Sequence, residues 1–485
     1  MTETLNVLFL AAEAEPFFKV GGLADVAGSL PWALRKLSSR KTGGFTLDVR
    51  LVLPLHRTAQ ADSTVHSLLE FPINKHGGEK GVRVYHKTWV DRPVYFISGD
   101  PISSSTGVYS LDQGIDQQKY VFFSIAALEM TRHLGWRPDI IHANDWHTAL
   151  ALYALLARRA DPFFSRTAGL LTLHNLPYMG GDITGLLSEY GLDPISEANL
   201  PTWATTQPLP IGLWAADAVC PVSTTYAREI LTPEFGCDLQ GYLKTQTEKI
   251  TGIINGLDMV AWDPAVDNIL KANFDAGDLQ GRLGNKLALQ ERVGLQVDRT
   301  TPLMAMVTRI DPQKGVDIAI DALRLITDLS WQFVILGTGD SRLEEAIRGL
   351  ETEFPDRVRA VISYDANLGR LIYGGADAFL MPSRYEPCGL SQMIAMRYGC
   401  VPIVRATGGL KDTVEEGKTG FLFQKATSEE LAEAIRRALS VYSNPEKWRR
   451  YQRNGMKQDF SWARSAQQYA IIYRSLYSRA NNQNV

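Results

Sequence analysis

One acidic residue stands where a strand should end and a helix should begin. Segment 382–391 reads PSRYEPCGLS and places Glu386 between the apolar residues 378–381 and the helical spacing of 390–398. In parallel α/β sheets ligands bind at such junctions, because helix N-termini offer unpaired N–H groups. Glu386 is therefore either a carboxylate that binds a ligand or a cap for the following helix, and the segment alone leaves both interpretations open.

A lysine and two glycines near the N-terminus could hold a phosphate group. Segment 19–25 reads KVGGLAD. Adjacent glycines let backbone N–H groups approach an anion closely, and the charge of Lys19 suits a diphosphate. The spacing is not that of the P-loop GxxxxGK[ST], and a Gly-Gly turn beside a solvated lysine would leave the same pattern.

Two further loops combine cations or glycines with the start of a helix. Segment 309–315, RIDPQKG, follows an apolar strand pattern, and it places Arg309 and Lys314 where they could neutralise a leaving diphosphate. Taken alone, these two side chains could equally be solvated surface charges. Segment 407–410, TGGL, follows another strand pattern and predicts a second anion-binding nest.

Histidine, asparagine and aspartate gather at the predicted ends of two other strands. The set comprises His142, Asn144, Asp145, His147, His174 and Asn175. These side chains offer donors and acceptors that match sugar hydroxyls, which favours a polyhydroxylated substrate. A metal site is less favoured, because no third ligand recurs at a useful spacing from His142 and His147. The sequence has no GxSxG nucleophile elbow, which argues against a hydrolase of that type.

Alternating strand and helix patterns must position these residues. The strands are predicted at 5–11, 46–53, 82–88, 94–97, 138–142, 169–173, 218–221, 303–308, 332–336, 358–362, 378–381 and 401–404. The loop-rich segment 232–273 separates two such series, and we place the boundary near Gly256. The prediction is an α/β protein with two Rossmann-like, doubly wound domains that face each other across a deep cleft. A strongly amphipathic helix is predicted at 461–479.

Composition narrows the function classes. The 485 residues carry a formal net charge of −3, which argues against a general nucleic-acid binder. Four cysteines without CxxC spacing predict free thiols in a reducing compartment. The N-terminus lacks a cationic region before its apolar run, and no apolar run approaches the roughly 20 residues that span a bilayer. We therefore expect a cytoplasmic protein that binds neither nucleic acid nor membrane.

Taken together and in order, the motifs resemble those of the bacterial glycogen synthase and plant starch synthase family, retaining glucosyltransferases of the GT-B fold. The motifs are KVGGLAD, HANDWH, LHN, SxxYAREI, NGLD, RIDPQKG, SRYEPCGL and TGGL, and the resemblance spans roughly residues 7–473. The resemblance implies an acceptor-side domain at 1–256, a donor-side domain at 257–460, and a C-terminal helix in 461–485 that packs back on the first domain.

The resemblance also implies a role for each matching residue. Phosphates of the donor would meet Lys19, Gly22, Arg309 and Lys314. The donor glucose would meet Glu386, the backbone of Cys388 and Gly389, and, at its far edge, Asn255 and His174. Adenine would stack on Tyr364, while Leu390, Thr407 and Gly408 would complete the nucleotide pocket. Asp145 would line the acceptor side, and Asp25 and Asn175 are further expected contacts with substrate.

The implied reaction is transfer of glucose from ADP-glucose to the non-reducing end of an α-1,4-glucan, with retention and without metal or pyridoxal phosphate. UDP-glucose as donor is the nearest alternative, followed by a glucan phosphorylase and by a non-catalytic glucan-binding protein. The sequence departs from the family pattern in several places. The most telling is LHNLPYMG, which has Met179 where a glutamine is expected and bears on acceptor recognition.

Overall fold

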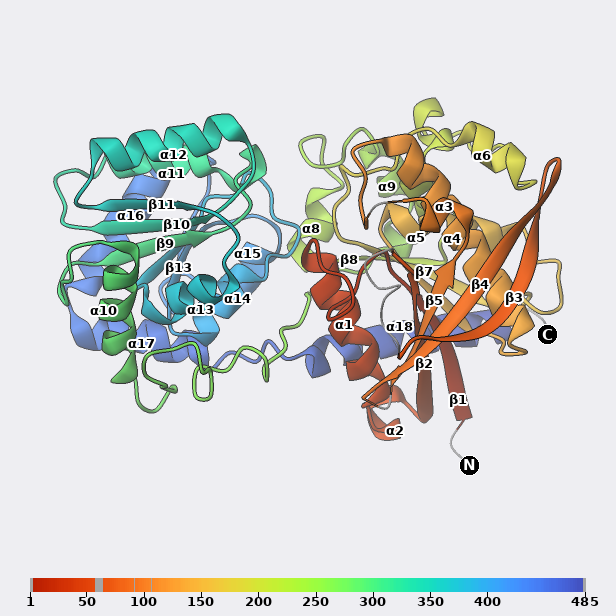
Figure 1. Ribbon diagram of the computed structural model, residues 1–485, viewed down its shortest axis with the longest axis horizontal. Helices are drawn as coiled ribbons and strands as arrows, with labels where there is room; N and C mark the ends of the chain where they lie inside the picture. Colours follow the sequence, from red (N-terminus) through yellow and green to blue (C-terminus); the bar gives the residue numbers. More distant parts are fainter. Residues whose placement is uncertain (1–2, 57–63, 91, 106, 483–485) are drawn as a thin grey trace. The chain divides into compact units, whose positions relative to one another are not determined.

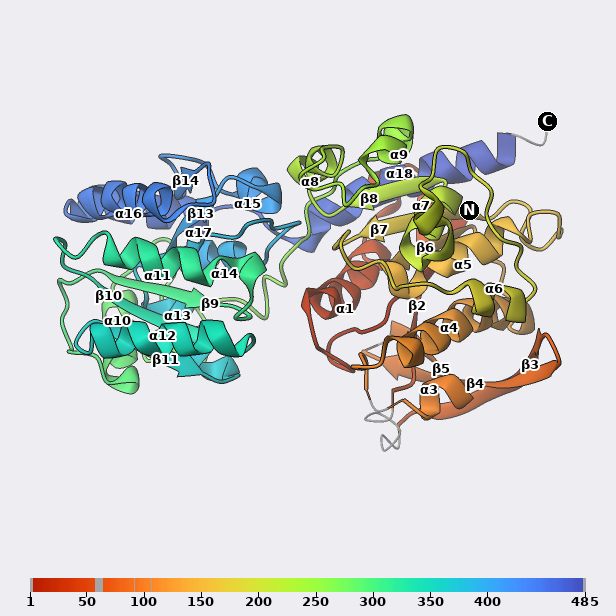
Figure 2. The ribbon, with the colours of Figure 1, turned by 90° about the horizontal axis from the view of Figure 1, so that it is seen from above.

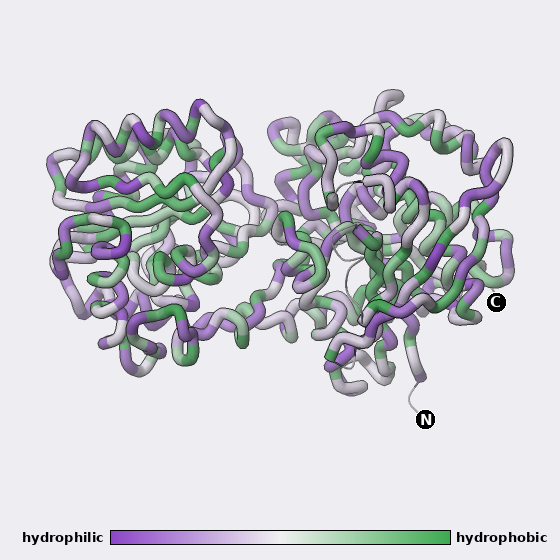
Figure 3. Tube along the Cα trace, viewed as in Figure 1, coloured by the Kyte–Doolittle hydropathy of each residue, from purple (hydrophilic) through white to green (hydrophobic). Residues whose placement is uncertain are grey.

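The computed structural model describes residues 3–56, 64–90, 92–105 and 107–482. The chain divides into two compact units. Unit 1 comprises residues 1–256 together with 462–485, and unit 2 comprises residues 257–461. Each unit is built around one sheet, and the traces of the strands inside each unit are predominantly hydrophobic (Figure 3).

The sheet of unit 1 has the order β3-β4-β5-β2-β1-β6-β7-β8. From β5 to β8 the neighbouring strands are parallel, whereas β3 and β4 form an antiparallel hairpin outside β5. The strands are β1 Glu3–Leu10, β2 Phe45–Pro54, β3 His66–Lys75, β4 Gly78–Trp89, β5 Arg92–Ser98, β6 Ile140–Asn144, β7 Ala168–Leu173 and β8 Ala218–Pro221. Counted without the hairpin, the strand order is 3-2-1-4-5-6, that of a doubly wound dinucleotide-type sheet.

The helices of unit 1 include one from the far end of the chain. They are α1 Gly22–Arg35, α2 Ser39–Thr42, α3 Asp100–Ser103, α4 Gln113–His133, α5 Trp146–Leu156, α6 Thr184–Glu189, α7 Pro208–Ala215, α8 Thr224–Glu229, α9 Gln240–Thr245 and α18 Trp462–Asn482, with short 3₁₀ turns at Thr202–Thr206 and Thr247–Lys249. The C-terminal helix α18 belongs to this unit (Figure 2), where Tyr473 lies in the same core as Phe9. Its Ser465 hydroxyl donates to the carbonyl of Ile254 at 2.7 Å.

Unit 2 repeats the same strand order with an entirely parallel sheet, β11-β10-β9-β12-β13-β14. Its strands are β9 Leu303–Val307, β10 Gln332–Gly337, β11 Val358–Ile362, β12 Ala378–Met381, β13 Val401–Arg405 and β14 Phe421–Phe423. Its helices are α10 Gly281–Val293, α11 Val316–Arg324, α12 Ser341–Glu353, α13 Ala366–Gly375, α14 Ser391–Arg397, α15 Gly408–Thr413, α16 Ser428–Tyr442 and α17 Pro445–Met456, with a 3₁₀ turn at Pro312–Lys314. Helices α11 and α12 lie on one face of the sheet and α13 and α14 on the other (Figure 1).

The strand order decides where ligands can bind in each unit. The connections leave the first strand, β1 or β9, and its neighbour, β6 or β12, in opposite directions, which opens a crevice at their carboxyl ends. Loops that follow β1 and β6 therefore meet in unit 1. Loops that follow β9 and β12 meet in unit 2.

The sequence prediction missed several elements, among them the strands β3 and β14 and the helices α7, α10 and α17. Strand β3 buries Phe71 and Ile73 but exposes most of its other residues, because it is the edge of the sheet, so its hydrophobic alternation is weak. Helix α17 buries only four of its 12 residues, and its polar sequence, PEKWRRYQRNGM, hides the short apolar stripe. No helix among the described residues is both long and apolar enough to span a membrane.

Candidate active site

The crevice of unit 2 holds a lysine and a glutamate in direct contact. Lys314 follows β9 and Glu386 follows β12, and the Lys314 Nζ lies 2.7 Å from Glu386 Oε2 and 3.0 Å from Oε1. The hydroxyl of Ser383 donates to the same Oε2 at 3.0 Å. The glutamate is 5% exposed, so its charge is stabilised by these partners rather than by bulk water.

Local sequence fixes the position of this lysine. The carboxylate of Asp311 caps the turn by accepting from the Lys314 N–H at 3.2 Å. Gly315 then adopts a φ of +66°, and a Cβ at this position would lie 2.1 Å from the carbonyl oxygen of Pro382. Only glycine allows the two loops to approach so closely. Arg384 joins them again by donating to both carboxylate oxygens of Asp317, at 2.8 and 2.6 Å.

The glycine-rich segment after β13 packs directly on the glutamate loop. A Cβ on Gly408 would lie 1.9 Å from the carbonyl oxygen of Glu386, and one on Gly409 would lie 2.1 Å from that of Cys388. The Gly409 N–H donates to the Glu386 carbonyl at 3.1 Å. Predicted site residues from two segments, 386–390 and 407–408, are thus brought together, and Leu390 is the N-terminal cap position of α14.

Glu386 does not cap that helix. The cap position, Leu390, makes no side-chain hydrogen bond to the helix, and the Glu386 carboxylate instead accepts from Lys314 and Ser383. The helix-cap interpretation of Glu386 is therefore wrong. Ser383 was not among the predicted residues, although it precedes Glu386 by only three positions.

Arg309 and Tyr364 extend this site toward solvent. The Arg309 side chain is 58% exposed and pairs with Asp311 at 3.2 Å. Tyr364 follows β11 and is 85% exposed, an unusual exposure for so large an aromatic residue. Both residues lie at the carboxyl edge of the sheet of unit 2, but neither touches the Lys314–Glu386 pair in the contacts of the described residues.

The crevice of unit 1 is built around a buried aspartate. Asp145 follows β6 with a φ of +53°, an unfavourable backbone conformation for a residue other than glycine. Its carboxylate reaches past the end of β7 and accepts from the backbone N–H groups of His174, at 2.6 Å, and Asn175, at 3.3 Å. These three predicted residues are therefore brought together.

Burial shifts the pKa values of this group in opposite directions. It raises the pKa of Asp145 from 3.8 to about 7, although the two backbone N–H donors oppose the shift. It lowers the pKa of His174 to about 3, so the imidazole is neutral at physiological pH. The His174 Nε2 lies 2.9 Å from Asn144 Oδ1, and the Asn144 amide nitrogen donates to the carbonyl of Leu10 at 2.9 Å. This orientation of Asn144 places the histidine proton on Nε2.

Two histidines of the predicted sugar-binding set belong to the core instead. His142 is fully buried, and its ring nitrogens lie 2.7 Å from the Tyr473 hydroxyl and 2.6 Å from that of Thr172. His147 is buried among aromatic rings, 4.7 Å from Tyr120. Strand β6 runs two residues further than predicted, so His142 lies within the strand rather than at its tip.

The glycine loop before α1 is organised by an acid that the sequence prediction missed. The Glu13 carboxylate accepts from the backbone N–H groups of Val20 and Gly21 and, at 3.0 Å, from the hydroxyl of Tyr109. Lys19 contacts Asp25 at 2.8 Å, and Gly22 opens the helix. The signal for Glu13 was its place just after the first strand, but its partner Tyr109 lies 96 positions away.

Two of the predicted site residues each have a buried amide oxygen without a hydrogen-bond partner among the described residues. These atoms are Asn175 Oδ1 and Asn255 Oδ1. Buried amide oxygens normally accept a hydrogen bond, so both are candidates to receive one from a bound hydroxyl group. Within the described ranges, no group of three or more His, Cys, Asp or Glu side chains is arranged to hold a metal ion.

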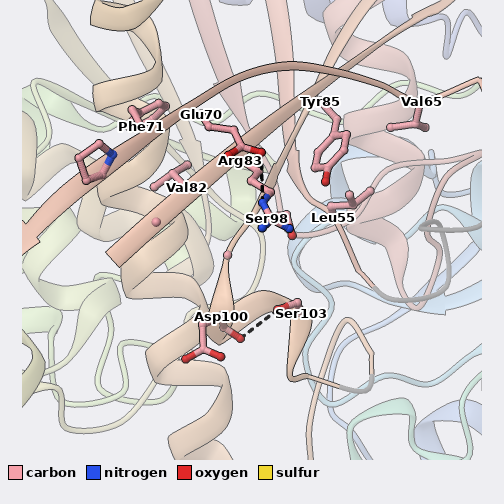
Figure 4. A pocket seen from close by; sticks show the side chains of 13 residues that line it. Leu55, Val65, Glu70, Phe71, Val82, Arg83, Tyr85, Ser98, Asp100 and Ser103 are labelled. Atoms are coloured by element: carbon pink, nitrogen blue, oxygen red, sulfur yellow. Dashed lines mark hydrogen bonds and ion pairs between the residues drawn. The ribbon is translucent and has the colours of Figure 1, made fainter. Parts of the chain in front are cut away.

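A separate pocket of about 930 Å³ lies beside the hairpin of unit 1 (Figure 4). Its lining includes Phe71, Tyr85 and the exposed ion pair between Glu70 and Arg83, whose Oε1 and Nε atoms are 3.2 Å apart. None of the predicted site residues lines it. The chemistry described above therefore lies elsewhere.

Comparison with known proteins identifies the family of the chain. The family model for the starch synthase catalytic domain matches residues 6–245, and that for glycosyl transferases group 1 matches residues 289–455. A glycogen synthase from Thermotoga maritima is 39% identical over 494 residues, covering 98% of this chain and 99% of that protein. The chain belongs to the glycogen and starch synthase family.

Other members of the glycogen and starch synthase family are similarly close. A glycogen synthase from Anaeromyxobacter dehalogenans is 40% identical, covering 97% of this chain and 99% of that protein. The catalytic domain of starch synthase IV from Arabidopsis thaliana, solved with ADP and acarbose, is 35% identical with a TM-score of 0.88, covering 98% of this chain and all of that one. The predicted family and the predicted GT-B fold of two doubly wound domains are confirmed.

Proposed function

We propose that this protein transfers glucose from ADP-glucose to the 4-hydroxyl at the non-reducing end of an α-1,4-glucan, with retention of configuration. Membership of the glycogen and starch synthase family supports a hexosyltransferase. ADP as donor nucleotide is favoured because the similar Arabidopsis starch synthase was solved with ADP bound. The exposed ring of Tyr364 offers a surface on which adenine can stack.

The single observation that carries the proposal is the Lys314–Glu386 pair. The Glu386 carboxylate accepts hydrogen bonds from the ammonium group of Lys314 and the hydroxyl of Ser383. The pair lies at the switch point of a sheet that has the nucleotide-binding strand order. A carboxylate so held is suited to accept hydrogen bonds from sugar hydroxyls, and the lysine offers positive charge to a diphosphate. The pair therefore supports binding of a nucleotide sugar.

The reaction proposed needs no enzyme nucleophile. The bond between C1 of glucose and the phosphate oxygen breaks, and the acceptor O4 forms a bond to C1 from the same face. The leaving phosphate oxygen takes the O4 proton, so the products are ADP and a glucan longer by one glucose. Lys314 and Arg309 would stabilise the charge that builds on the leaving diphosphate, a contribution worth roughly 3 kcal/mol per contact.

The acid and histidine of unit 1 suit recognition of hydroxyl groups. Asp145 and the neutral His174 are held rigidly by backbone and amide contacts, and the free oxygens of Asn175 and Asn255 add acceptors. We assign Asp145 and Asn175 to the acceptor glucan, and His174 and Asn255 to the donor glucose. We also assign Lys19, Gly22 and Asp25 to the loop that holds the donor diphosphate, without help from a metal or pyridoxal phosphate.

Radiolabelled transfer tests the proposal directly. Glycogen is incubated with labelled ADP-glucose or UDP-glucose, in the presence and absence of EDTA, and β-amylase should release the label as maltose. We expect transfer from ADP-glucose to exceed that from UDP-glucose and to survive EDTA. Preference for UDP-glucose would overturn the donor assignment, and a glucosyl-enzyme trapped on Glu386 would overturn the mechanism.

A further inference from the structure

A fully buried lysine on α4 is tied to one short loop. Lys119 is 0% exposed, and its Nζ donates to the carbonyl oxygens of Val108, at 2.7 Å, and Gly107, at 3.0 Å. The Nζ also lies 2.7 Å from Asp116 Oδ1. A buried ammonium is costly unless it is paired and hydrogen-bonded, so the position of these partners is tightly constrained.

The same face of α4 holds the loop on the other side of Tyr109. Asp116 Oδ2 accepts from the Ser110 N–H at 2.8 Å, and the Tyr120 hydroxyl donates to the Val108 carbonyl. The backbone is therefore held by α4 both immediately before and immediately after Tyr109. The tyrosine itself projects from the held segment and is 37% exposed.

The hydroxyl of Tyr109 connects this segment to the glycine loop before α1. It donates to Glu13 Oε1 at 3.0 Å. The other carboxylate oxygen accepts from the backbone of Val20 and from Gly21, the latter at 3.0 Å. An unbroken series of contacts thus runs from Lys119, through Tyr109 and Glu13, to the loop that contains Lys19.

We propose that Lys119 is a positioning residue for loop 19–22, acting through the segment that carries Tyr109 and through the carboxylate of Glu13. Glu13 fixes the loop by accepting two of its N–H groups, and Tyr109 fixes Glu13. The inference rests on the proposed function, in which this loop holds the diphosphate of the donor. Loss of the series should therefore weaken donor binding and leave the acceptor unaffected.

Two changes to the series are compared with a matched control. Tyr109→Phe removes only one hydroxyl from a half-exposed ring. The pair Lys119→Met and Asp116→Asn removes the buried ion pair without leaving a single charge. The control pair, Lys286→Met and Asp377→Asn, removes a similar ion pair in unit 2, where Lys286 Nζ lies 2.8 Å from Asp377 and also donates to backbone carbonyls.

Hydrogen exchange and steady-state kinetics are measured on the full-length enzymes. We expect exchange in peptides covering 18–24 to accelerate about tenfold in Tyr109→Phe and further in the Lys119 pair, with β1 unchanged. The KM for ADP-glucose should rise about tenfold while the KM for glycogen stays within twofold. The control pair should lower the thermal midpoint without changing either the exchange of 18–24 or the KM for ADP-glucose.

Results that differ from these expectations would each contradict one step of the reasoning. Unchanged exchange over 18–24 in Tyr109→Phe, which is expected to fold normally, overturns the positioning role of the series. Faster exchange with an unchanged KM for ADP-glucose also overturns the inference, because the loop would then not serve the donor. A parent enzyme that transfers no glucose contradicts the proposed function instead, and the exchange data still decide whether Lys119 positions the loop.

Discussion

Replacing Asp145 by asparagine should stabilise the protein at alkaline pH while it reduces activity. Burial raises the pKa of Asp145 from 3.8 to about 7. The folded protein therefore holds a proton that the unfolded chain has already lost between these two pH values. Because the folded state then binds more protons, stability falls as pH rises from about 4 to about 7 and is constant above that range. Asparagine cannot ionise, so the Asp145→Asn variant should not lose stability in this way as the pH rises.

The magnitude follows from the two pKa values. One pKa unit corresponds to about 1.4 kcal/mol, so ionisation of Asp145 costs the folded protein about 4 kcal/mol at pH 8 and about 2 kcal/mol at pH 5. The asparagine Oδ1 can still accept from the backbone of His174, so the contact that orients the loop is retained. The stability of Asp145→Asn relative to the parent should thus increase by about 2 to 3 kcal/mol between pH 5 and pH 8.

Urea unfolding of parent and variant at several pH values measures this difference. Asp317→Asn is the control for the sign, because Arg384 lowers the pKa of Asp317. That variant should be less stable than the parent at both pH 5 and pH 8, by a similar amount. If the difference between Asp145→Asn and the parent did not change from pH 5 to pH 8, or if the variant were less stable at pH 8, our account of the buried carboxylate would be refuted.

Three further changes test the site. Lys314→Met should lower kcat about a hundredfold, since a diphosphate contact is lost. It should also cost about 3 kcal/mol of stability in urea unfolding, since buried Glu386 loses its cationic partner. Near-normal turnover would exclude this role of Lys314. Gly408→Ala should abolish transfer, because the added Cβ would lie 1.9 Å from the carbonyl oxygen of Glu386. Gly417→Ala is the control, since Gly417 also has a positive φ, +73°, but open space around its Cβ. This control variant should retain transfer. The pKa of His174 is lowered to about 3, so its imidazole is neutral throughout the physiological range. The fall in rate at acid pH should therefore be the same in His174→Gln as in the parent. Loss of this acid limb in the variant would show that His174 titrates, against our assignment of a neutral imidazole.

Much of the candidate site was predictable because residues at the ends of strands can be recognised from local sequence patterns. Lys314 and Glu386 each stand at the end of an apolar strand and before a helix, and both signals can be read within ten residues. That they touch is not a local property. It depends on the strand order, which places β12 beside β9 although β10 and β11 intervene in the chain.

The residues that were missed act through contacts between distant segments. Glu13 can be found near a strand end, but only the folded structure brings it to Tyr109 and to its loop. The error over His142 arose from the local pattern itself. The strand ends two residues later than predicted, so His142 lies inside the strand and its side chain is in the core instead of at the strand end. Sequence patterns locate loops well, whereas side-chain direction near strand ends depends on register with the neighbouring strands.

The two units place similar residues at equivalent points of the same strand order and give them different properties. In unit 2 the acid after the fourth strand of the series, Glu386, has the ammonium of Lys314 at 2.7 Å. In unit 1 the carboxylate of the equivalent acid, Asp145, accepts only from backbone N–H groups among the described residues, while Lys19 is paired with Asp25 and Glu15. Burial without a cationic partner raises the pKa of Asp145 to about 7, whereas the Glu386 carboxylate is in direct contact with an ammonium group. Both acids follow the fourth strand of the same order, so the lack of a cationic side chain beside Asp145, rather than the fold, accounts for its pKa near neutrality.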